Sequence, residues 1–260
     1  MIQLSFGFGA LEAEFWRLIF VMTRIGAALV AAPLFGIPTV PPQARVIVAG
    51  AVAVLVCGWT GVAAPPALLS VPGLLSVLGE VLVGLSLGFV LQMAFAAPIL
   101  GAEVIGGAMG MNMAVSVDPN SGASSPAIGQ YFTVLMTLIF LAMGGHLQWI
   151  RLVVESYSLL PPGQTWLGAG QFHAVAALGA MMFVTGATIA LPVCLVLLVV
   201  QMVTGVLSRS APSLNLFSLG LPAGVLAGIA ALLVAAPVLT DIMVRLNGNA
   251  LDAVAGLLRR

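Results

Sequence analysis

Residues 74–100 read LLSVLGEVLVGLSLGFVLQMAFAAPIL, an apolar run in which Glu80 is the only charged residue. The run is longer than the roughly 20 residues that an α-helix needs to cross the hydrocarbon core of a membrane. Small and polar residues recur in it at every fourth position, and glycines at this spacing let neighbouring helices approach closely. We therefore expect a membrane helix whose stripe of such residues packs against protein, with helix packing favoured over a proton relay as its role. The stripe consists of Ser76, Glu80, Gly84, Gly88 and Gln92.

The composition of the whole chain is that of a polytopic membrane protein. Of its 260 residues, 61% are hydrophobic and only 6% are charged, against about 25% charged residues in ordinary soluble domains, and the mean hydropathy is +1.19. We predict a single all-α integral membrane domain over residues 1–260, with about six apolar helical segments, several of them kinked or broken by proline or glycine. The six segments are 15–35, 46–64, 74–100, 127–150, 172–206 and 216–240.

The fifth of these segments is too long for one straight membrane span. As a helix it would be about 52 Å long, whereas the hydrocarbon core is about 30 Å thick. Pro192 lies near its middle and predicts a kink that divides the segment into two shorter arms. Trp16, Trp59 and Trp149 fall at or near segment ends, where we expect indole rings to lie at the level of the lipid headgroups.

The charged residues, the histidines and the cysteines together exclude several classes of function. Eight arginines balance eight acidic residues and there is no lysine, so nothing favours nucleic-acid binding. A phosphate-binding loop of the G-x-x-x-x-G-K-[ST] type needs a lysine and is therefore absent. The two histidines and two cysteines are not at the spacing of metal ligands. We predict that the protein is not an enzyme, has no catalytic residues and takes no metal or other cofactor.

Arg24 is the charged residue that most needs a partner. It lies deep in the first apolar segment, where an unpaired charge costs about 2.5 to 3.5 kcal/mol on membrane-insertion scales. A buried structural ion pair is favoured over a role in moving ions. The sequence leaves the acidic partner open among Glu80, Glu103 and Asp118.

Residues 101–126, GAEVIGGAMGMNMAVSVDPNSGASSP, differ from every other long segment. They combine glycines with methionines at alternate positions and an Asp118-Pro119-Asn120 turn signal. Such a stretch is unsuited to a straight lipid-facing helix, and irregular backbone at membrane depth occurs where it is buried in protein or lines a cavity. We therefore predict that these residues are irregular and form the functional part of the protein.

Several motifs, in order, resemble the FliR family, the flagellar export-gate component that has counterparts in virulence injectisomes. The most specific is residues 208–222, SRSAPSLNLFSLGLP. Others are Arg24 with a proline-rich turn after it, the sequence VDP at 117–119 and the sequence GHL at 145–147. The resemblance runs from about residue 15 to about residue 245 and departs from the family at Ser213, where glutamine is frequent.

The resemblance implies a subunit of a larger assembly in the bacterial inner membrane, within the flagellar basal body. Family members join FliP-like and FliQ-like subunits in a hetero-oligomeric gate of helical hairpins, associate with an FlhB-like subunit, and pass unfolded flagellar proteins. Lipid surrounds the complex, and part of it is raised towards the periplasm. The candidates for a buried charge or for helix packing are Arg24, Glu80, Gly84, Gly88 and Glu103, together with Arg209 and Asn215 of the family motif.

The resemblance further implies that the stretch 101–126 acts as a plug or constriction in the export channel. Methionine is apolar and flexible, so a ring of methionines can close a channel and still conform to a passing chain. The candidate plug residues are Gly106, Gly107, Met109, Gly110, Met111, Met113 and Asp118. The alternative for the methionines is packing against neighbouring helices. Alternatives for the whole chain are an injectisome gate subunit and a stand-alone secondary transporter.

Overall fold

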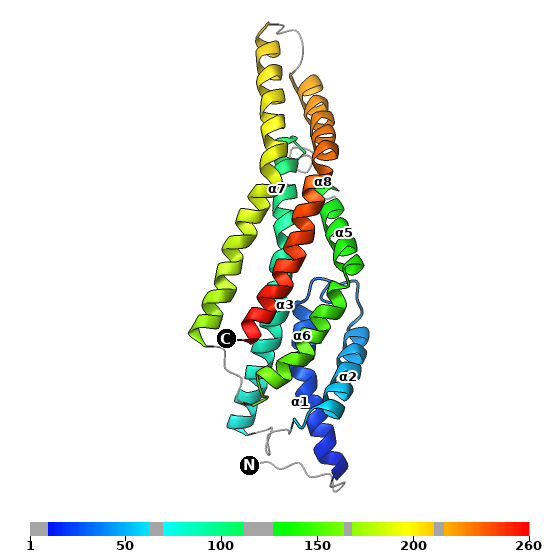
Figure 1. The fold of residues 1–260 in the computed structure, drawn as a ribbon. Helices are drawn as coiled ribbons and strands as arrows, with labels where there is room; N and C mark the ends of the chain where they lie inside the picture. The colour runs from blue at the N-terminus through cyan, green and yellow to red at the C-terminus, as the bar shows by residue number, and fades with distance from the viewer. Residues whose placement is uncertain (1–9, 63–69, 112–126, 164–167, 211–215, 260) are drawn as a thin grey trace. The chain divides into compact units, whose positions relative to one another are not determined.

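The computed structural model describes residues 10–62, 70–111, 127–163, 168–210 and 216–259. Every regular element within those ranges is an α-helix, which confirms the predicted all-α class (Figure 1). The helices are α1 (Ala10–Ala31), α2 (Pro42–Trp59), α3 (Val71–Ala108), α5 (Ala127–Ala142), α6 (Gly145–Leu159), α7 (Ala169–Ser210) and α8 (Leu216–Leu258).

Fewer helices qualify as membrane spans than the six segments predicted. Among the described residues, four helices are long and apolar enough to cross a membrane, and the bent pair α5 and α6 makes a fifth if it is counted as one span. Helix α1 falls outside this set, since it carries Glu12, Glu14, Arg17 and Arg24 within 22 residues. The first apolar segment is thus a charged helix whose arginines need partners elsewhere in the protein.

Helix α3 corrects the prediction that irregular structure begins at residue 101. It continues through Pro98 to Ala108, so the first part of the glycine-rich stretch is helical. The helix then ends in a Schellman motif, in which the Met111 amide donates to the Gly106 carbonyl and the Gly110 amide to that of Gly107, both at 3.0 Å. Gly110 has the positive φ of +82° that this ending requires.

The predicted segment 127–150 is two helices and not one. Helices α5 and α6 meet at a bend of 68°. Gly144 adopts a left-handed conformation (φ +67°) at the start of α6, which explains the bend because glycine reaches this conformation at little cost. Two adjacent glycines, Gly144 and Gly145, were the sequence signal for it.

Prolines do not divide the last two helices. Helix α7 is continuous through Pro192 for 42 residues, so the proline does not interrupt the helix, and the expected kink at this residue stays a prediction. Helix α8 passes Pro222 and Pro237 and reaches Leu258, well beyond the predicted end at residue 240. Prolines are tolerated in membrane helices where side chains and local adjustments satisfy the freed carbonyls, and the predicted segments accordingly contained these prolines.

The chain divides into two compact units, and helices α3, α7 and α8 contribute residues to both. Unit 1 comprises residues 1–93, 144–178 and 248–260, and unit 2 comprises residues 94–143 and 179–247. In unit 1, Trp149 is only 1% exposed, and its indole N–H donates to the Leu87 carbonyl at 3.2 Å. Trp149 is therefore a core residue, which corrects the expectation that it lies among lipid headgroups.

Two arginines of unit 1 donate hydrogen bonds to backbone carbonyls, one at the C-terminal end of α2 and the other in the turn before it. Arg17 donates from Nη2 to the carbonyls of Cys57 and Thr60, at 2.8 and 2.6 Å, at the end of α2. Arg45 donates to the carbonyls of Ile37 and Val40 in the proline turn before α2. The last carbonyls of a helix have no partner within the helix and carry its negative dipole end, so a guanidinium there is stabilising.

Candidate functional site

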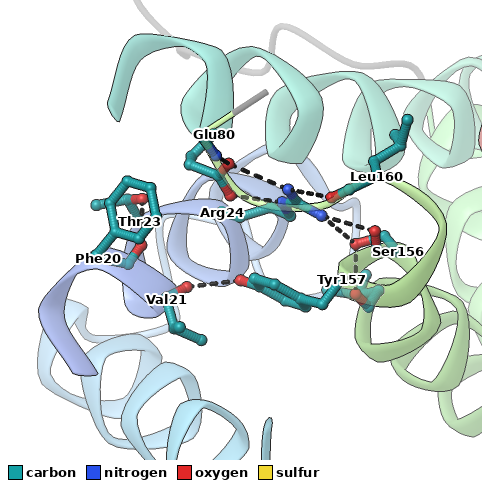
Figure 2. A network of polar contacts seen from close by, with 10 residues as sticks. Phe20, Val21, Thr23, Arg24, Glu80, Ser156, Tyr157 and Leu160 are labelled. Carbon is teal, nitrogen blue, oxygen red and sulfur yellow. Dashed lines mark hydrogen bonds and ion pairs between the residues drawn. The ribbon is translucent and has the colours of Figure 1, made fainter. Parts of the chain in front are cut away.

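Arg24 and Glu80 form a buried ion pair in unit 1 (Figure 2). Both side chains are fully buried. The Arg24 Nε donates to Glu80 Oε2 at 2.8 Å, and its Nη2 donates to Oε1 at 3.1 Å, which is the bidentate geometry that a guanidinium and a carboxylate favour. Of the three acids that the sequence left open as a partner for Arg24, the structure selects Glu80.

The remaining donors of Arg24 bind the end of helix α6. Its Nη1 donates to the Ser156 carbonyl and hydroxyl, at 2.9 and 3.0 Å, and its Nη2 donates to the Leu160 carbonyl at 2.9 Å. All five N–H groups of the guanidinium are thereby used. Arg24 on α1 therefore ties together α3, through the carboxylate, and the C-terminal turn of α6.

Tyr157 closes one side of this network. Its ring lies 4.3 Å from the Arg24 guanidinium carbon, in cation–π geometry. Its hydroxyl donates to the Val21 carbonyl on α1 at 2.6 Å (Figure 2). Glu80 also accepts a hydrogen bond from the Gly163 amide at 3.2 Å. The network neutralises a buried charge and fixes three helices, which is the structural role favoured for Arg24.

Gly84 and Gly88 let α3 lie directly against α1. A Cβ atom at Gly84 would collide with the Arg24 carbonyl and with the Ala27 side chain, and one at Gly88 would lie 2.6 Å from the Ala31 Cβ. The backbones can approach this closely because both positions lack a side chain. The close contact brings Glu80, one turn away on α3, within reach of Arg24.

The end of α3, residues 108–111, is the root of the predicted plug and lies in unit 2 between α7 and α8. Gln201 of α7 donates from Nε2 to the Ala108 carbonyl at 2.7 Å, which satisfies the end of α3. Met109 is only 2% exposed and lies on two glycines of α8. A Cβ at Gly228 would lie 2.6 Å from its side chain, and one at Gly224 would lie 3.2 Å from its carbonyl oxygen. Met109 thus has the helix-packing environment that was the alternative to a plug.

The other predicted plug residues lie either within or at the end of α3, or outside the described residues. Gly106 is buried and Gly107 exposed within α3, while Gly110 and Met111, both half-buried, end that helix. Met113 and Asp118 lie outside the described residues. The structure therefore places the root of the predicted plug against α7 and α8. The role of residues 101–126 in closing a channel stays a prediction.

The remaining predicted residues lie apart from both clusters. Glu103 is exposed on α3, and Arg209 is exposed in the last turn of α7. Asn215 lies outside the described residues. Within the part of the chain that the structure describes, no group of three or more histidines, cysteines or acids could hold a metal ion.

Sequence reasoning missed Gln201 and the residues of α6 that receive Arg24. Gln201 was the signal available in α7, because an amide within a long apolar run must find a hydrogen-bond partner. Ser156 and Tyr157 offered no comparable signal, because their partners on α1 are more than 130 residues away in the chain. Such long-range pairs become visible only once the helices are placed.

The contact between Met109 and α8 can be tested by exchanging side-chain volume. Gly228→Ala should destabilise the protein, because the added methyl group needs space that Met109 fills. Met109→Ala alone should also destabilise it, by about 2 to 5 kcal/mol. In the double variant the two changes should compensate by about 0.5 to 3 kcal/mol, measured as the midpoint of thermal unfolding in detergent. Gly220→Ala is the matched control on α8, since nothing lies within 4 Å of a Cβ there.

Comparison with known proteins assigns the chain to one family. The model of "Bacterial export proteins, family 1" matches residues 15–250. The flagellar biosynthetic protein FliR of Pectobacterium carotovorum subsp. carotovorum is 30% identical over 244 residues, which cover 94% of this chain and 92% of the relative. The chain belongs to the FliR family of bacterial export proteins.

Two further FliR proteins show the breadth of the family. The one from Escherichia coli (strain K12) is 33% identical over 69% of each chain. The one from Bacillus subtilis (strain 168) is 31% identical, over 78% of this chain and 80% of its own length. The resemblance seen in the sequence motifs is thereby confirmed. With several apolar helices of spanning length, this FliR-family chain is a membrane protein.

Proposed function

We propose that this FliR-family chain is a subunit of the inner-membrane export gate of a flagellar type III secretion apparatus. In this role it helps to form and to close the channel through which unfolded flagellar proteins leave the cell. Its partners are FliP-like, FliQ-like and FlhB-like subunits, and it acts without catalytic residues or a cofactor. The observation that carries the proposal is the family match over residues 15–250, together with three relatives that are each named flagellar biosynthetic protein FliR.

The distribution of apolar side chains supports a role in an assembly. Helix α7 exposes large hydrophobic residues along much of its length, among them Val199, Met202, Val203 and Val206, each at least 58% exposed. Helix α8 does the same with Leu226, Leu233 and Val234. Lipid or other subunits must cover these side chains, and a multi-subunit gate supplies both.

The construction of unit 2 supports a closing role for the residues that follow Met111. Gln201, Gly224 and Gly228 hold the start of the stretch, so its root is fixed on two helices. A plug needs such a fixed root together with apolar, adaptable side chains beyond it, as Met111 and Met113 provide.

Native mass spectrometry tests the assembly directly. The chain is tagged and co-expressed with its neighbouring FliP-like and FliQ-like subunits, then purified in mild detergent. One copy within a larger hetero-oligomer is the expected result. A stable monomer or homodimer that retains no partner would contradict the proposal and favour a secondary transporter.

Shortening the predicted plug should make the gate leak. Deleting residues 112–116 leaves the end of α3 and the packing of Met109 in place, so assembly should be preserved. We expect resting cells with this variant to take up small solutes that the unaltered gate excludes. Met111→Leu with Met113→Leu is the control, because this exchange keeps an apolar side chain of similar volume and should stay closed. Unchanged permeability in an assembled deletion variant would refute the closing role.

A further inference from the structure

A groove of about 650 Å³ lies between α3 and α7 within unit 2. Its walls are apolar and include Leu100, Val104, Phe183 and Leu191. Small residues lie between them, because Gly101 and Gly186 bring the two helices into backbone contact: a Cβ at Gly186 would lie 3.0 Å from the Ala97 carbonyl oxygen. An apolar channel with small residues along it has the form that receives another helix at close distance.

Glu103 is the one charged residue among the described residues that line this groove. Its side chain is exposed, and no ion pair or hydrogen bond joins it to any other residue in the described ranges. The acid Glu80 on the same helix is in contrast fully paired with Arg24. A carboxylate on an apolar helix of spanning length is costly unless a cation meets it, so the groove lacks the positive charge that would complete it.

We propose that the groove between α3 and α7 receives an apolar helix of a partner subunit, and that an arginine or lysine on this helix pairs with Glu103. The inference rests on the proposed assembly into a gate and adds to it a place and a recognition chemistry. Acyl chains of lipid would fill the apolar walls but leave the carboxylate without a cation. A partner helix with a basic side chain would both cover the apolar walls and pair with the Glu103 carboxylate.

Cys194 gives a direct measure of whether the groove is filled, because it lines the groove and is half-buried and free. With Cys57→Ser it is the only cysteine of the chain. Its rate of alkylation by N-ethylmaleimide is compared between the isolated chain and the chain co-purified with its partner subunits, both in the same detergent. We expect the rate to fall by about tenfold or more on assembly. An unchanged rate in a complex whose partners are shown by native mass spectrometry would overturn the inference and leave the proposed function intact.

Charge substitutions test the pairing itself. Glu103→Lys should reduce the amount of co-purified partner by about tenfold or more, because like charges would face each other, and should restore the reactivity of Cys194. Glu103→Gln should have a smaller effect in the same direction. Glu155→Lys is the control, since Glu155 is an exposed acid on α6 that meets only Arg151 of its own helix. Partner retention and Cys194 protection that survive Glu103→Lys would exclude the charge pair.

The remaining outcomes are also decisive. Protection of Cys194 when the isolated chain is placed in lipid nanodiscs, without any partner, would assign the groove to lipid and overturn the inference. A chain that forms no hetero-oligomer would remove the proposed function, and the docking of a partner helix with it.

Discussion

Glu80→Ala is expected to destabilise the protein by about 3 to 5 kcal/mol, because it leaves the charge of Arg24 buried and uncompensated. Both side chains are fully buried, so water cannot replace the lost carboxylate. Arg24→Ala should cost at least as much, since it leaves Glu80 buried without its cation and removes the guanidinium's hydrogen bonds to Ser156 and to the Leu160 carbonyl. The midpoint of thermal unfolding in detergent measures both effects.

The ion pair between Arg151 and Glu155 supplies the matched control. It joins residues one turn apart on α6, and its side chains are 79% and 42% exposed. Exposed pairs of this kind contribute about 0 to 1 kcal/mol, so Glu155→Ala should leave the midpoint nearly unchanged. Equal effects of Glu80→Ala and Glu155→Ala would show that the buried network does not stabilise the fold.

Gly84→Ala is expected to have the second large effect. A methyl group at this position would meet the Arg24 carbonyl and Ala27 Cβ, and backbone cannot move aside as a flexible side chain can. Helices α1 and α3 must therefore separate, at a cost of about 1 to 3 kcal/mol. Because Glu80 lies one turn away, the separation should also weaken its bond to Arg24, so Gly84→Ala and Glu80→Gln should be less than additive.

Gly26→Ala distinguishes this effect from the general consequence of replacing a helical glycine. Gly26 lies on α1, and nothing is within 4 Å of the position that its Cβ would occupy. Alanine is favoured over glycine in a helix by about 1 kcal/mol, so this variant should be as stable as the unaltered protein or slightly more stable. A destabilisation equal to that of Gly84→Ala would contradict the steric explanation.

Local patterns in the sequence correctly predicted an all-α membrane protein and part of the site around Arg24. The four-residue spacing correctly indicated a packed face at Glu80, Gly84 and Gly88, since spacing along one helix determines which residues share a face. The predicted stripe was wrong at its end, because Gln92 is exposed. The depth of Arg24 in an apolar run correctly indicated that it needs a partner. The identity of that partner depends on how helices pack, which a pattern within one segment does not contain.

Glycine misled the prediction of where α3 ends, whereas the prolines inside the predicted segments did not end a helix. Pro98, Pro192 and Pro237 lie inside continuous helices, because the surrounding protein and apolar environment favour helix at almost any local cost. Gly101 and Gly106 serve close packing or burial within α3, whereas Gly110 and Gly144 adopt positive φ and do end or bend a helix. Composition alone does not separate these two uses of glycine.

The distances along the chain within the Arg24 network have a consequence for biosynthesis. Arg24 is made 56 residues before Glu80 and 136 residues before Leu160. At a translation rate of about 5 to 20 residues per second, its last partner follows roughly 7 to 27 s later. During that interval Glu80 is synthesised first, and the guanidinium still lacks its partners on α6. The hydrogen-bond network of Arg24 can therefore be complete only after more than half of the protein has been synthesised.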